Sequence, residues 1–192
     1  NRIEKITEND INKLTAEELR LHLKSAQKDL RKRGLLLSVS RKIAGKDSLS
    51  EILWELVDIT TKELGAERGS LFLNDPLTGE LYSRVAQGEL TREIRLLNSS
   101  GIAGSVFQSG VGEIVHKPYE DERFNAEIDQ QTGFVTKSIV CAPIRTARND
   151  VIGVVQILNK HKGRFTKDDL DIVGAIAAQA SVTLQNAQGV EE

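Results

Sequence analysis

Two short alternating runs of residues, joined by a tight turn, place the strongest limit on what this chain can fold into. Residues 68–74 follow the period of two that predicts a strand, with Leu71 and Leu73 on one face, and residues 81–86 form a second such run. Only the turn at residues 76–79 connects them. A parallel pair needs a crossover of a dozen or more residues, so the two strands must pair as an antiparallel hairpin.

Further strands are predicted downstream of this hairpin. Residues 92–96 alternate again, with Ile94 pointing inward. Residues 138–144 and 151–158 are rich in β-branched residues, and the polar turn at residues 149–150 joins them. Because short turns connect the strands, we expect a central antiparallel sheet of about six strands.

Helix start signals lie toward the beginning of the chain. Thr15 and Glu18 have the spacing of a capping box, which predicts a long helix running to about Ala44. Ser48 and Glu51 have the same spacing and open an amphipathic helix, which Gly65 ends.

The last helix is predicted to begin at Thr166, with Asp169 as its capping partner, and to run to about Gln188. Lys160, at the end of the last strand, is placed to form an ion pair with Asp169. Asp169 can also act as a cap alone, and the two roles are compatible. Helices at both ends of a chain and an antiparallel sheet between them predict an α+β fold with helices packed on the sheet.

The long first helix belongs to a region, residues 1–47, that we interpret as an N-terminal tail and a linker or dimerisation helix. Leu23, Leu30 and Leu37 recur every seven residues, a spacing suited to a partner helix. We therefore expect a homodimer formed through the N- and C-terminal helices. The basic cluster 31–33 has no interleaved aromatic residues and no base-reading motif follows it, so a solvated helix face is favoured over a site for nucleic acid or anionic lipid.

No residue pattern in the chain is typical of a catalytic or metal centre, and we expect a module that is not an enzyme. His22, His116 and His161 are scattered, and no paired metal-ligand or nucleophile motif occurs. Cys141 lies in an apolar strand, which favours a buried structural thiol. A single cysteine suits a reducing cytoplasm, and no apolar run is long enough to span a membrane.

The segment from Gly101 to Thr136 is the least regular part of the chain and is a candidate functional cap. Its glycine-flanked start, residues 101–104, opens a short helix whose backbone N–H groups can approach a phosphate, although a glycine pair more often serves a tight turn. Asp129, Thr132 and Thr136 form a polar series, and a helical turn would place both hydroxyls on one side. The competing interpretation is ordinary capping by these side chains.

From about Ser48 to Ala187 the chain resembles a GAF domain, the small-molecule sensor module. It is most similar to the cyclic-nucleotide-binding type found in phosphodiesterases and cyanobacterial adenylyl cyclases. That type carries Asn-Lys, a variable gap, Phe, three residues and Asp-Glu, and here Leu170 stands where Glu is usual. Ala86 stands where some relatives place an aromatic residue that stacks on the purine. The stretches that carry the resemblance are residues 68–73, 85–88, 101–104, 123–125, 129–134 and 138–143, with Asn159, Lys160, Phe165 and Asp169.

The resemblance implies two sets of site residues. In this family the Lys–Asp pair is thought to brace the pocket without touching the ligand, which gives Asn159, Lys160, Phe165 and Asp169 a structural role. The implied ligand contacts are Ser70, Ala86, Gln87, Ile102, Ala103, Asp129, Thr132, Thr136 and Gln156.

The resemblance also implies a function, with residues 48–188 as the sensory domain. We expect a regulatory module that binds a cyclic nucleotide, with cAMP favoured over cGMP from the cyclase resemblance, and that controls an attached output domain. It implies no metal and no cofactor beyond this ligand. The alternative is a ligand-free GAF module that serves dimerisation and signal transmission.

Overall fold

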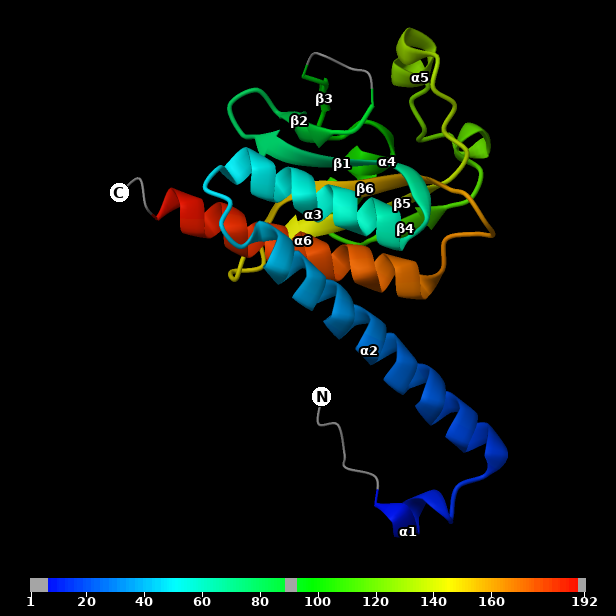
Figure 1. The fold of residues 1–192 in the computed structure, drawn as a ribbon. Helices are drawn as coiled ribbons and strands as arrows, with labels where there is room; N and C mark the ends of the chain where they lie inside the picture. Colours follow the sequence, from blue (N-terminus) through cyan, green and yellow to red (C-terminus); the bar gives the residue numbers. More distant parts are fainter. Residues whose placement is uncertain (1–6, 89–92, 190–192) are drawn as a thin grey trace.

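The structure is a computed structural model that describes residues 7–88 and 93–189. Its centre is a six-stranded antiparallel sheet in the order β3-β2-β1-β6-β5-β4 (Figure 1). The two longest strands, β1 and β6, pair with each other in the middle of the sheet. The strands are β1 (Ala66–Asp75), β2 (Glu80–Ala86), β3 (Arg95–Leu97), β4 (Glu113–Val115), β5 (Ile139–Arg145) and β6 (Val151–Lys160).

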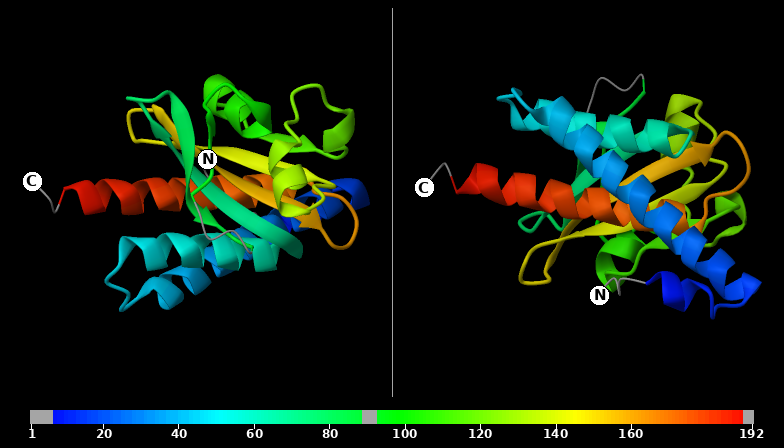
Figure 2. Two further views of the ribbon diagram at one scale, coloured as in Figure 1. Left: turned by 90° about the horizontal axis from the view of Figure 1, so that it is seen from above. Right: turned by 60° about the horizontal axis from the view of Figure 1, so that its bottom comes forward.

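Helices cover both faces of this sheet, and Figure 2 shows two of them, α3 and α6, side by side on one face. The long helix α2 packs on this pair near its C-terminal end and extends away from the sheet toward its N-terminus (Figure 1). The helices are α1 (Glu8–Ile11), α2 (Ala16–Ile43), α3 (Leu49–Glu63), α4 (Gly101–Ser109), the 3-10 turn η1 (Pro118–Glu120), α5 (Glu127–Thr132) and α6 (Lys167–Gln188).

The alternation of strand residues divides the interior into two cores. On β5, Val140 and Ala142 face α3 and α6, whereas Ile139 and Cys141 face the opposite side, where α4 packs. The second core is smaller, and the α4–α5 segment covers it. This arrangement confirms the predicted α+β fold with its antiparallel sheet and preceding long helix.

Most of the predicted elements are confirmed. The Thr15–Glu18 capping box is present, with Glu18 N donating to Thr15 Oγ1 at 3.2 Å. Gly65 adopts a φ of +59° directly after α3, which only glycine adopts freely. The predicted strand at residues 92–96 begins at Arg95, and residue 92 lies outside the described residues.

Two local expectations need correction. Ser48 is the N-cap of α3, but its side chain makes no cap hydrogen bond, so the second capping box was wrong. Burial of Leu53, Leu56 and Val57 fixes this helix instead. Strand β4 was not predicted, because three residues are too few to give a recognisable period.

Among the described residues, no helix is both long enough and apolar enough to cross a membrane.

Candidate ligand-binding site

A cavity lies between the second face of the sheet and the α4–α5 segment. Its empty volume is about 870 Å³, which includes open solvent at its mouth. All nine residues that the family resemblance assigned to ligand contact line this one cavity. They are Ser70, Ala86, Gln87, Ile102, Ala103, Asp129, Thr132, Thr136 and Gln156.

The floor of the cavity presents two polar side chains that are free to bind a ligand. Ser70 on β1 pairs in register with Gln156 on β6 and with Ala86 on β2. Within the described part of the chain, neither the Ser70 hydroxyl nor the Gln156 amide has a side-chain hydrogen bond. A hydroxyl and a primary amide each donate and accept, so both can pair with a polar ligand.

The N-terminus of α4 forms one wall. Ser100 is its N-cap but makes no side-chain cap bond, so the N–H groups of the first turn keep their donor capacity. Ile102 and Ala103 bury their side chains behind this turn. Gly104 is required here, because a Cβ would lie 2.6 Å from the backbone carbon of Ser99. The positive end of the helix dipole thus faces the cavity, as an anion site needs.

Asp129 organises the cap above the floor. Its buried carboxylate accepts hydrogen bonds from Tyr119 Oη at 2.6 Å, from Thr136 N at 2.7 Å and from Thr136 Oγ1 at 2.8 Å. The bond to Asp129 raises the pKa of Tyr119. Sequence reasoning missed Tyr119, because it meets Asp129 only through the fold.

The predicted helical turn through Thr132 and Thr136 is not formed. Helix α5 ends at Thr132, and Gly133 follows in the left-handed region with a φ of +72°. The Thr132 hydroxyl donates to Ile128 O at 2.8 Å, whereas Thr136 binds Asp129. The two threonines line the same cavity but do not share a helix face.

Gln87 is engaged with the protein. Its Oε1 accepts from Gly69 N at 2.9 Å and its Nε2 donates to Asp58 Oδ1 at 3.1 Å. These bonds hold the end of β2 against β1 and α3, so the side chain of Gln87 helps to shape the cavity wall.

The predicted bracing residues lie outside the cavity lining, at the end of β6 and around the start of α6. Asn159 has a φ of +61°, accepts from Lys137 N at 2.6 Å and donates to Val135 O at 2.8 Å. It therefore ties the end of the cap to β6.

Asp169 is fully buried and performs both of the roles considered for it. It accepts from Lys160 Nζ and from Thr166 N, the latter at 2.9 Å, and Phe165 is buried alongside. Its second oxygen, Oδ1, has no hydrogen bond but lies 3.5 Å from Arg31 Nη2 on α2. The end of β6, the start of α6 and helix α2 thus meet at one carboxylate.

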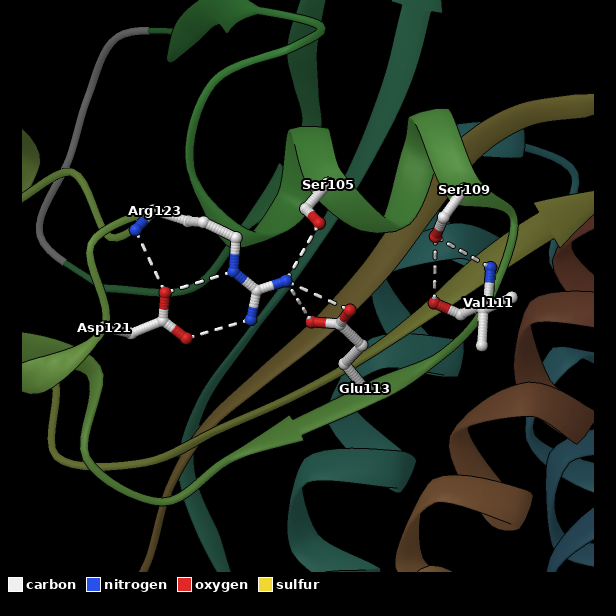
Figure 3. A network of polar contacts seen from close by, with 6 residues as sticks. All are labelled: Ser105, Ser109, Val111, Glu113, Asp121 and Arg123. Carbon is white, nitrogen blue, oxygen red and sulfur yellow. Dashed lines mark hydrogen bonds and ion pairs between the residues drawn. The ribbon is translucent and has the colours of Figure 1, made fainter.

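An arginine network holds the base of the cap. Arg123 donates to Asp121, to Glu113 on β4 and to Ser105 on α4, as Figure 3 shows. Its bonds lower the pKa of Asp121 to about 2. Sequence reasoning gave Arg123 no role, because its partners are brought together only by the fold.

Cys141 is fully buried, and burial raises the pKa of its thiol. This placement agrees with a structural thiol.

The family model of the GAF domain matches residues 48–184, well over half of the chain. The chain belongs to the GAF domain family. Solved GAF domains share its fold at low identity. The GAF domain of an Acinetobacter phosphoenolpyruvate-protein phosphotransferase is 20% identical, with a TM-score of 0.71 over 83% of this chain and 96% of its own. The corresponding domain from Coxiella burnetii is 16% identical, with a TM-score of 0.76 over 84% of this chain and 97% of its own.

Curated relatives of this GAF domain include long phosphodiesterases. The probable 3′,5′-cyclic phosphodiesterase pde-5 of Caenorhabditis elegans is 38% identical over 80% of this chain. The dual 3′,5′-cyclic-AMP and -GMP phosphodiesterase 11 of Drosophila melanogaster is 33% identical over 86% of it. The chain spans only 23% and 12% of the lengths of these two proteins.

Proposed function

We propose that this GAF domain binds a 3′,5′-cyclic purine nucleotide in the described cavity and acts as a non-catalytic regulatory module for an output domain. The proposal rests on one observation above all. A single cavity is lined by all nine residues that the resemblance to cyclic-nucleotide-binding GAF domains assigned to ligand contact. These nine residues come from five separate segments of the chain. The relatives are named as cyclic-nucleotide phosphodiesterases, which supports the same ligand class.

The chemistry of the lining suits such a ligand. The free N–H groups at the start of α4 are placed to receive the cyclic phosphate. Ser70 and Gln156 on the floor are placed to bond the ribose or the base. The preference for cAMP over cGMP came from the family resemblance, and the relatives named above do not support it, because none is named for cAMP alone. A primary amide such as that of Gln156 can pair with either purine.

Regulation would use the contacts that join the site to the terminal helices. Lys28 on α2 forms ion pairs with Asp168, at 3.2 Å, and with Asp171. Arg31 bonds Glu63 at 3.0 Å and approaches Asp169. A shift of the cap on binding would reach α2 and α6 through β6 and Asp169, but only if the nucleotide binds the two helix arrangements with different affinity.

The site assignment is tested by replacing Gln156 with leucine. We expect affinity for the bound nucleotide to fall about 5- to 20-fold, because one hydrogen bond is lost and an amide of similar size is replaced by an apolar group. Isothermal titration calorimetry measures this change. Gln185→Leu, at an exposed glutamine of α6, is the matched control and should bind as the wild type does. Equal nucleotide affinity in Gln156→Leu and Gln185→Leu would show that Gln156 does not contact the ligand.

A second function, dimerisation, has its own support. The linker helix exposes Leu23, Leu30 and Leu37, each with more than half of its surface accessible, and these are the residues of the seven-residue repeat. We propose that a second copy of the chain covers this seam. The proposal holds with or without a nucleotide in the cavity.

Leu30→Glu is expected to convert the dimer to a monomer in sedimentation velocity, because it places a charge in the centre of the seam. Leu21→Glu is the matched control, since Leu21 is 63% exposed on the same helix but outside the repeat. A wild-type chain that sediments as a monomer at all accessible concentrations would refute this role.

A further inference from the structure

Arg68 lies in the cavity, yet neither residue pattern nor family resemblance gave it a role. Its guanidinium carbon is 4.2 Å from the centroid of the Phe134 ring, so cap and floor meet here in a cation–π contact. Gly88 leaves the space that the guanidinium occupies, because a Cβ at Gly88 would lie 2.8 Å from Nη1. The side chain is therefore held in a defined position.

The donors of this guanidinium are free within the described residues. Arg31, Arg95 and Arg123 each bind carboxylates. No ion pair or hydrogen bond of the Arg68 side chain occurs among the described residues, and its contact with Phe134 places the guanidinium carbon over the ring. A guanidinium carries five N–H donors, and without an acceptor among these residues they are available to a ligand.

The position of Arg68 defines which part of the nucleotide it can meet. Arg68, Ser70 and Phe72 alternate onto the cavity side of β1, and four residues of strand span about 13 Å. Phe72 belongs to the same core cluster as Ile102 and Ala103 of α4. A nucleotide with its phosphate at the start of α4 therefore directs its base toward the Arg68 end.

We propose that Arg68 is a specificity-determining residue that donates to the acceptor edge of a guanine base, so that the site selects cGMP over cAMP. The proposal rests on the proposed function and names its ligand. Guanine presents two acceptors, O6 and N7, on the edge that arginine pairs with, whereas adenine replaces O6 with an amino donor. A fixed guanidinium can donate to both acceptors of guanine, whereas its donors face the amino donor of adenine. This reverses the expectation of cAMP drawn from the family resemblance.

The test is calorimetric titration of the chain with cGMP, cAMP and cIMP, in the wild type and in two variants. Cyclic IMP keeps O6 and N7 but lacks the 2-amino group, so it isolates the edge that Arg68 reads. We expect the wild type to bind cGMP and cIMP about 10- to 100-fold more tightly than cAMP. In Arg68→Ala the ratio of cGMP to cAMP affinity should fall to about 1, chiefly through loss of cGMP and cIMP affinity. In Arg68→Gln the preference should change to cAMP, because an amide pairs with the N6/N7 edge of adenine.

Controls separate this role from a structural one. Arg84→Gln changes an arginine on β2 whose guanidinium bonds Ser50 and which does not line the cavity, so it should keep the wild-type ratio. The thermal midpoint of each variant establishes that it folds. Two outcomes would overturn the assignment while leaving cyclic-nucleotide binding intact. One is a ratio of cGMP to cAMP affinity that stays unchanged in Arg68→Ala, even if both affinities fall. The other is a wild type that prefers cAMP. A folded wild type that binds none of the three would overturn the proposed function as well.

Discussion

The Asp169→Ala variant is expected to lose about 3–5 kcal/mol of unfolding free energy. Asp169 is fully buried, and its carboxylate meets the Lys160 ammonium, the Thr166 backbone N–H and, at 3.5 Å, the Arg31 guanidinium. Removal leaves the partly buried Lys160 without its counter-charge and the backbone N–H of Thr166, the N-cap of α6, without its side-chain acceptor. Urea unfolding followed by circular dichroism measures the loss.

Asp168 provides the matched control, one residue away. Its side chain is 52% exposed and its ion pair with Lys28 lies at the surface, so Asp168→Ala should cost at most about 1 kcal/mol. If the two variants lose equal unfolding free energy, Asp169 does not hold β6, α6 and α2 together, and the proposed coupling between these elements through Asp169 is wrong.

The Asp129→Ala variant is expected to bind nucleotide on the order of 100-fold more weakly than the wild type, because a few side chains dominate the affinity of a binding site and we assign Asp129 to them. Its carboxylate organises Tyr119 and Thr136 across the cap, and its loss leaves the buried Thr136 N–H without an acceptor. Calorimetry measures the affinity. Hydrogen exchange of residues 127–136 should become faster, because the cap loses the group that holds it.

Glu122→Ala is the control for this prediction, since Glu122 is an exposed carboxylate of the same cap segment. It should bind nucleotide as the wild type does. Thr132→Ala should have a smaller effect than Asp129→Ala, because the Thr132 hydroxyl donates to its own helix at Ile128 O. An affinity of Asp129→Ala within about threefold of the wild type would contradict the placement of Asp129 in the site.

The fold was largely predictable from the sequence because it depends on local patterns. The period of two at β1, β2, β5 and β6 and the capping residues Thr15 and Thr166 act within a few residues of the chain. Strand β4 was missed because its three residues pair with β5 and carry no period of their own. The cap of α3 was misjudged because core packing, and not the Ser48 side chain, fixes the start of that helix.

The candidate site was predictable only in part, for a different reason. Spacing and composition singled out Asp129, Thr132 and Thr136 as a polar series, but the full set came from the family resemblance. Tyr119, Arg123 and Arg68 act through partners that are brought close by the fold, and no local pattern marks such contacts. The left-handed conformation of Asn159, which aims its amide at the cap, is likewise set by tertiary contacts.

The most direct test of the proposed function is calorimetric titration of the chain with cGMP and with cAMP, after unfolding and refolding to remove any ligand carried over. We expect saturable binding of one nucleotide per chain, with a rise in the thermal midpoint as nucleotide is added. A refolded chain with the expected secondary structure that shows no heat of binding and no thermal shift with either nucleotide would contradict the proposed function.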